Sequence, residues 1–156
     1  MAPAIHMYGL PTYQPGEIPP RSQLFYRETV YPPTMGIPPV AETICRMATD
    51  FYECRDVSMI DLLRSSGYVQ DPSAITEQHL EEVFRAYPDL INAWVRLSED
   101  KRTPEGWYLR SAYRSTAWKV GRVPKNTEEL RFKDQFKACA FFVKQEVELY
   151  RVHACK

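Results

Sequence analysis

The sequence has no excess of charge of either sign, because 20 Lys and Arg residues oppose 20 Asp and Glu residues among 156. Proteins drawn to nucleic acid or anionic membranes by a net field carry a basic surplus. The longest strictly apolar run, residues 138–143, is far shorter than the roughly 20 residues of a membrane span. The N-terminus shows no charged segment followed by an apolar one, as a secretory signal would. We therefore expect a soluble, cytoplasmic protein that binds neither nucleic acid nor a membrane.

Recognisable catalytic and metal-binding motifs are also missing. The chain contains no GxGxxG, Walker A, HExxH or GxSxG pattern. Its four cysteines form no CxxC pair, and Cys45, Cys54 and Cys139 fall within helical patterns, as packed thiols do. His153 and Cys155 could offer two metal ligands, whereas a zinc site usually needs three or four. We predict no cofactor, no metal and no catalytic residue, although a site assembled in space from distant residues stays open.

Proline is concentrated at one end of the chain. Nine of the 13 prolines lie in the first 39 residues, where only four charged side chains occur. Proline removes amide donors and disfavours the α conformation before it, so this stretch is not helical. Its aromatic residues are too apolar for a typical disordered linker. We predict an extended arm over residues 1–37 that lies along the body, along a partner or along a second copy of the chain. We predict a single domain over residues 38–156.

The rest of the chain predicts an α+β domain. Apolar residues recur at helical spacing after residue 40, and Ser58, Thr76 and Asp134 are suitable N-caps for three later helices. Pro88 is placed to open a further helix. Three short runs rich in aromatic and branched residues, "GWYL", "TAWKVGRV" and "ELRF", predict a small antiparallel meander. The predicted order is therefore N-terminal helices, a small sheet and a long closing helix.

One stretch, "LSEDKRTPEGWYL" at residues 97–109, combines a charge cluster with a turn and two aromatics. Every residue type has an architectural role here: cations suit a helix C-terminus, and "TPEG" suits a type I turn. The functional alternative is a loop that presents charged and aromatic side chains to a protein partner, as loops braced by rigid elements often do. The candidate binding residues are Glu99, Asp100, Lys101, Arg102, Glu105, Trp107 and Tyr108.

A second alternative is a small enzyme or an anionic-ligand-binding domain that uses the same loop. Lys101 and Arg102 would clamp an anion, since arginine forms bidentate contacts with phosphate and carboxylate groups. Glu99, Asp100 or Glu105 would then act as acid or base. No histidine accompanies the cluster in sequence, which favours the protein-binding interpretation.

The phrase "LINAWVRLSEDKRTPEGWYL", followed by "AWKVGR" and "ACAFFVKQEVELY", resembles small bacterial domains of the toxin-immunity type. The resemblance extends over about residues 57–150, and the proline-rich arm has no counterpart in it. It implies a single-domain cytosolic protein whose role is to bind one protein partner.

Overall fold

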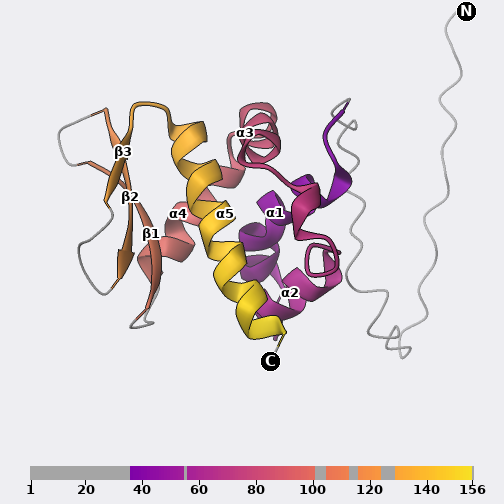
Figure 1. Cartoon of the computed structure of the whole chain (residues 1–156). Helices are drawn as coiled ribbons and strands as arrows, with labels where there is room; N and C mark the ends of the chain where they lie inside the picture. The colour runs from indigo at the N-terminus through magenta and orange to yellow at the C-terminus, as the bar shows by residue number, and fades with distance from the viewer. Residues whose placement is uncertain (1–35, 55, 101–104, 113–115, 124–128, 156) are drawn as a thin grey trace, which may run out of the picture. The chain divides into compact units, whose positions relative to one another are not determined.

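The computed structural model describes residues 36–54, 56–100, 105–112, 116–123 and 129–155 (Figure 1). The predicted arm over residues 1–37 lies almost entirely outside this part of the chain. The described residues belong to one compact unit, Pro33–Lys156. It contains helices followed by a three-stranded antiparallel sheet and a closing helix, which confirms the predicted α+β class.

In the described part of the chain, five elements precede the sheet. They are α1 (Pro39–Glu53), α2 (Met59–Ser65), the 3₁₀ turn η2 (Pro72–Ala74), α3 (Glu77–Ala86) and α4 (Leu90–Asp100). Each begins near a residue that suits a helix start. Pro39 occupies the first turn of α1, where its missing amide costs no hydrogen bond. The Ser58 hydroxyl accepts from the Asp61 amide at 3.1 Å, and Thr76 forms a capping box with His79.

The sheet has strand order β1-β2-β3, with β1 at Gly106–Ser111, β2 at Trp118–Val123 and β3 at Leu130–Phe132. In the antiparallel register, Leu109 faces Val120, and both side chains are buried. Alternation along the strands therefore gives the sheet one face toward the helices and one face away from them. The three runs predicted as a meander form these strands.

The closing helix α5 (Gln135–Ala154) packs against both the sheet and the helical part of the domain. Figure 1 shows it between the sheet on one side and α1, α2 and α3 on the other. The Asp134 side chain accepts from the Phe136 amide at 2.8 Å and caps its start. Because both sides of α5 are covered, its buried positions extend round the helix: Ala138, Cys139, Ala140, Phe142, Val143, Glu146 and Val147.

The core is apolar with a few polar groups bonded inside it. The fully buried Trp94 donates its indole N–H to the Cys45 carbonyl at 2.7 Å, which satisfies both groups without water. Burial raises the pKa of the Cys45 and Cys139 thiols well above their usual value, so both remain protonated. Among the described residues, no helix combines the length and the hydrophobicity needed to cross a membrane.

Candidate functional site

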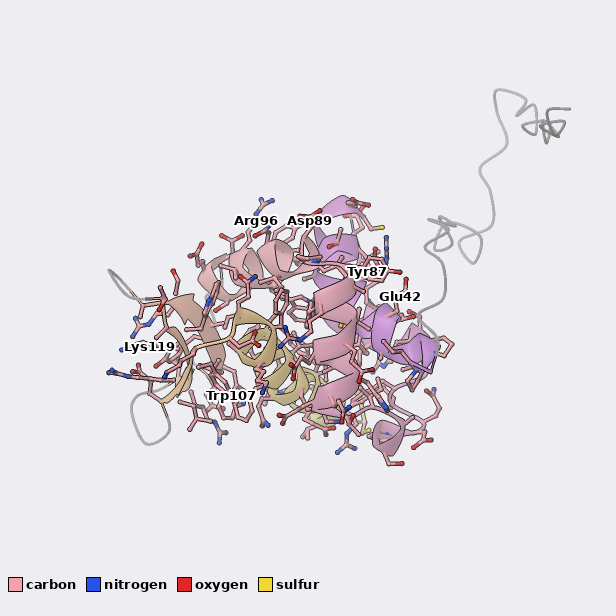
Figure 2. All side chains as sticks on the ribbon, turned by 90° about the horizontal axis from the view of Figure 1, so that it is seen from above. Glu42, Tyr87, Asp89, Arg96, Trp107 and Lys119 are labelled. Atoms are coloured by element: carbon pink, nitrogen blue, oxygen red, sulfur yellow. The ribbon has the colours of Figure 1, made fainter. Side chains whose placement is uncertain are left out.

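The outer face of the sheet is not covered by any described helix (Figure 1). Tyr108 and Arg110 of β1 point to this face, because Leu109 between them is buried on the other. Lys119 of β2 lies opposite Arg110, and Arg131 of β3 lies opposite Lys119. Figure 2 shows Lys119 on the side of the sheet away from α5 and Trp107 on the side toward α5. The open face therefore gathers three cations in three adjacent strands.

One carboxylate lies among these cations. Glu129, the residue before β3, receives hydrogen bonds from Lys119 at 2.7 Å and from the Tyr108 hydroxyl at 2.9 Å. Arg110 approaches the same carboxylate at 3.4 Å and Arg131 at 3.8 Å. We call these five residues, Tyr108, Arg110, Lys119, Glu129 and Arg131, the outer cluster. It holds three cations against one carboxylate, so it carries two excess positive charges in a chain of zero net charge.

Titration of the outer cluster follows from these contacts. Hydrogen bonds from Lys119 and then from Tyr108 lower the pKa of Glu129 from 4.5 to about 2. Burial, followed by the hydrogen bond to the Glu129 carboxylate, raises the pKa of Tyr108. Glu129 is therefore ionised and Tyr108 protonated across the physiological range, and the Tyr108 hydroxyl stays a hydrogen-bond donor. This arrangement suits electrostatic recognition of an anionic group better than proton transfer near neutral pH.

Tyr108 lies across the sheet because its neighbour is a glycine. Gly121 is opposite Tyr108 in the register, and a Cβ atom there would lie 2.8 Å from Tyr108 Cε1. No side chain larger than hydrogen leaves room for the ring in this position. Gly121 thus lets the tyrosine hydroxyl reach Glu129, and the Arg110 guanidinium lies 5.0 Å from the centre of the ring.

The strand that carries Tyr108 and Arg110 is fixed at its free edge. The Ala112 amide donates to the Ala117 carbonyl at 2.8 Å, so these two residues form a hydrogen-bonded pair next to the strands. Hydrogen-bonded and non-hydrogen-bonded pairs alternate along antiparallel strands, and the backbone N–H and C=O groups of Trp107 and Leu109 therefore point away from β2. The Leu109 amide donates to Ser98 Oγ at 2.7 Å, and the Trp107 amide donates to Glu146 Oε2 at 3.2 Å. Side chains of α4 and α5 therefore pair with this edge and hold β1 in place.

The acidic residues predicted as binding residues lie on the last turn of α4. Glu99 and Asp100 are both exposed there. Asp100 Oδ2 accepts from the Tyr52 hydroxyl of α1 at 2.8 Å and lies 3.6 Å from Arg96 Nε. Burial and the hydrogen bond to Asp100 raise the pKa of Tyr52 to about 12. Asp100 thus joins α4 to α1, while Lys101 and Arg102 lie outside the described residues.

The remaining predicted binding residues divide between the two faces of the sheet. Glu105 precedes β1 and is exposed. Trp107 is half-buried on the inner face, where its ring meets the Phe141 ring edge-on with centroids 5.8 Å apart. Tyr108 belongs to the outer cluster. The structure therefore does not bring the two adjacent aromatics to one surface.

The sequence interpretation missed four of the five members of the outer cluster: Arg110, Lys119, Glu129 and Arg131. Period-two alternation in "WYLRS" and "WKVGRV" was the available signal, because it places Tyr108 with Arg110 and Lys119 with Gly121 on shared faces. The pairing of these strands and the position of Glu129 depend on register, which the sequence does not specify.

No known family model, curated protein or solved structure matches this chain. Within the described ranges, no three His, Cys, Asp or Glu side chains gather in a way that could hold a metal ion. The geometry of the outer cluster is therefore the basis for a functional assignment.

Proposed function

We propose that the protein is a non-catalytic protein-binding module that contacts its partner through the outer face of the sheet. The observation that carries this proposal is the outer cluster, which displays Arg110 and Arg131 with side chains 59% and 70% exposed. Arginine and tyrosine supply much of the affinity at protein interfaces, and surrounding charges set orientation and association rate.

The rigidity of the sheet supports the same proposal. β1 is paired on one side with β2 and held on the other by Ser98 and Glu146. A face fixed in this way loses little conformational entropy when a partner binds, which favours affinity. The resemblance to toxin-immunity domains implies the same class of function, so the proposal is of an immunity-like or accessory protein that binds one protein partner.

Glu99, Asp100 and Glu105 stay predicted contacts in a second part of the interface. Glu99 and Asp100 end α4, and Glu105 directly precedes β1, the strand that carries Tyr108 and Arg110. Pairing of two copies through residues 1–37 also stays a prediction. Sedimentation of the full chain beside a chain lacking those residues tests it, because removal of a pairing arm would convert a dimer to a monomer.

The proposed interface is tested by affinity capture from a lysate of the host, with mass spectrometry of the captured proteins. Wild type is compared with Lys119→Glu and Arg110→Glu, and Lys137→Glu on α5 is the matched control for charge reversal. We expect one stoichiometric protein that is lost with both outer-cluster variants and kept with the control. Equal capture by all four folded proteins would exclude the outer face as the interface.

A further inference from the structure

The outer cluster has the donor arrangement of a carboxylate-binding site, and Glu129 of the same chain occupies it. Lys119 and Arg131 approach Oε1 of Glu129, while Tyr108 and Arg110 approach Oε2. Four donors from three strands thus converge on one carboxylate. The hydrogen bonds from Lys119 and Tyr108 to this carboxylate are charge-assisted and therefore stronger than neutral ones, so the cluster favours an anionic group at this position.

Glu129 does not saturate the hydrogen-bonding capacity of Arg110 and Arg131. Arg110 reaches it at 3.4 Å and Arg131 at 3.8 Å, whereas a well-formed arginine–carboxylate pair has bonds of about 2.7–2.9 Å and is often bidentate. Both guanidinium groups are largely exposed to solvent. They therefore retain the capacity to bind further carboxylates more closely than they bind Glu129.

Glu129 can leave the cluster without breaking the sheet. The register of β3 begins at Leu130, so displacing the Glu129 side chain costs no ladder hydrogen bond between β2 and β3. Its side chain is 30% exposed, which gives an incoming group access to the same donors. Water would hydrate the displaced Glu129 carboxylate, and the four donors would then bind the incoming group.

We propose that the partner presents a cluster of carboxylates to the outer face, and that Glu129 holds the place of one of them until the partner binds. This inference rests on the proposed protein-binding function and identifies the chemistry of the partner surface. It also gives Glu129 a selective role, because a partner with a single weak anion gains too little to displace an intramolecular carboxylate.

The observations favour an acidic protein segment over a nucleic acid. Three cations are few compared with the roughly 6–10 phosphate contacts of a salt-sensitive nucleic-acid complex. The ring of Tyr108 is engaged by Gly121 and Arg110, whereas sheets that bind single strands offer open aromatic rings for base stacking.

The test uses the full chain and a fluorescein-labelled hexaglutamate peptide, with anisotropy measured at low ionic strength. We expect Arg110→Ala and Arg131→Ala to weaken binding by about tenfold, the equivalent of about 1.4 kcal/mol. Glu129→Gln should tighten binding by about fivefold, because both a competing carboxylate and a repulsive charge are removed. Glu53→Gln, which changes the net charge equally at an exposed position on α1 outside the sheet, is the control.

A second variant separates competition from charge. Glu129→Asp keeps the charge and shortens the side chain, so it should still tighten binding relative to wild type if Glu129 competes for the donors. Circular dichroism establishes that each variant folds. Unchanged or weaker binding by both Glu129→Gln and Glu129→Asp would refute the displacement of Glu129.

Two further outcomes distinguish this inference from the proposed function. Tighter binding of a single-stranded RNA 12-mer than of hexaglutamate would overturn the acidic-segment assignment. If the host partner is lost with Lys119→Glu while hexaglutamate binding does not depend on the outer cluster, the proposed function stands and the carboxylate inference fails. If capture does not depend on the outer cluster, the proposed function itself fails.

Discussion

The Ser98 hydroxyl contacts both backbone groups of Leu109, accepting from its amide at 2.7 Å and donating to its carbonyl at 3.1 Å. The Ser98 side chain thereby forms the two hydrogen bonds with the Leu109 backbone that a further strand would otherwise form at this edge of the sheet. Edge strands with unpaired backbone groups are sites of unwanted pairing between chains. This contact therefore both positions β1 and protects its edge.

Replacement of Ser98 by alanine should destabilise the protein by about 1–3 kcal/mol, because the Leu109 amide and carbonyl would lose their partner beside a buried side chain. Chemical unfolding followed by circular dichroism measures the change. Ser111→Ala, at an exposed serine at the end of the same strand, is the matched control and should cost less than about 0.5 kcal/mol. Equal losses for the two variants would mean that Ser98 does not support the edge.

Gly121→Ala should cost about 1–3 kcal/mol in the wild-type background, because the new methyl group would overlap the Tyr108 ring. In a Tyr108→Ala background the same substitution should be neutral or stabilising by about 0.5 kcal/mol, since glycine weakens a strand interior. A double-mutant cycle from urea unfolding measures this coupling. Additive effects would show that the tyrosine ring is not what requires glycine at position 121.

The Lys144 ammonium joins α5 to the segment between α2 and α3. It donates to the Tyr68 hydroxyl at 2.8 Å, to the Ile75 carbonyl at 2.9 Å and to the Pro72 carbonyl at 3.3 Å. Burial, followed by a hydrogen bond to Glu148, raises the pKa of Tyr68, so its hydroxyl stays protonated. This network ties the loop between the two helices to the closing helix.

Tyr68→Phe should therefore lower stability by about 1–2 kcal/mol, and Lys144→Met by more, because the lysine serves two carbonyls as well as the hydroxyl. Thermal unfolding compares them with Lys137→Met, an exposed lysine near the start of the same helix. A larger loss for the tyrosine variant than for the lysine variant would contradict this order.

Acid should remove the stabilisation that Glu129 gains from the cations of the outer cluster. The folded-state pKa of Glu129, about 2, lies below its ordinary value of 4.5. Its contribution to stability is therefore complete above about pH 4.5 and lost as the pH falls toward 2. The unfolding free energies of wild type and Glu129→Gln should accordingly converge between pH 5 and pH 2. Curves that stay parallel over this range would mean that the carboxylate is not stabilised by the cations around it.

The sequence by itself determined the α-helices, the strands and their order. Proline at a helix start, serine, threonine and aspartate at N-caps, and apolar residues at helical or alternating spacing act over a few residues, so they can be identified without knowledge of the fold. For this reason the predictions of α1, α3, the meander and the N-cap of α5 were confirmed.

Only the tertiary structure decided which side chains share a surface. The outer cluster joins residues of three strands with Glu129, and its geometry depends on strand register and on the space over Gly121, both of which arise from non-local contacts. The prediction centred on residues 99–108 followed the sequence order of charges. In the folded protein, Asp100 instead contacts α1, Trp107 contacts α5, and Tyr108 contacts the residue before β3. Sequence neighbours separated in this way because side chains alternate across a strand, while distant residues met because strands pair.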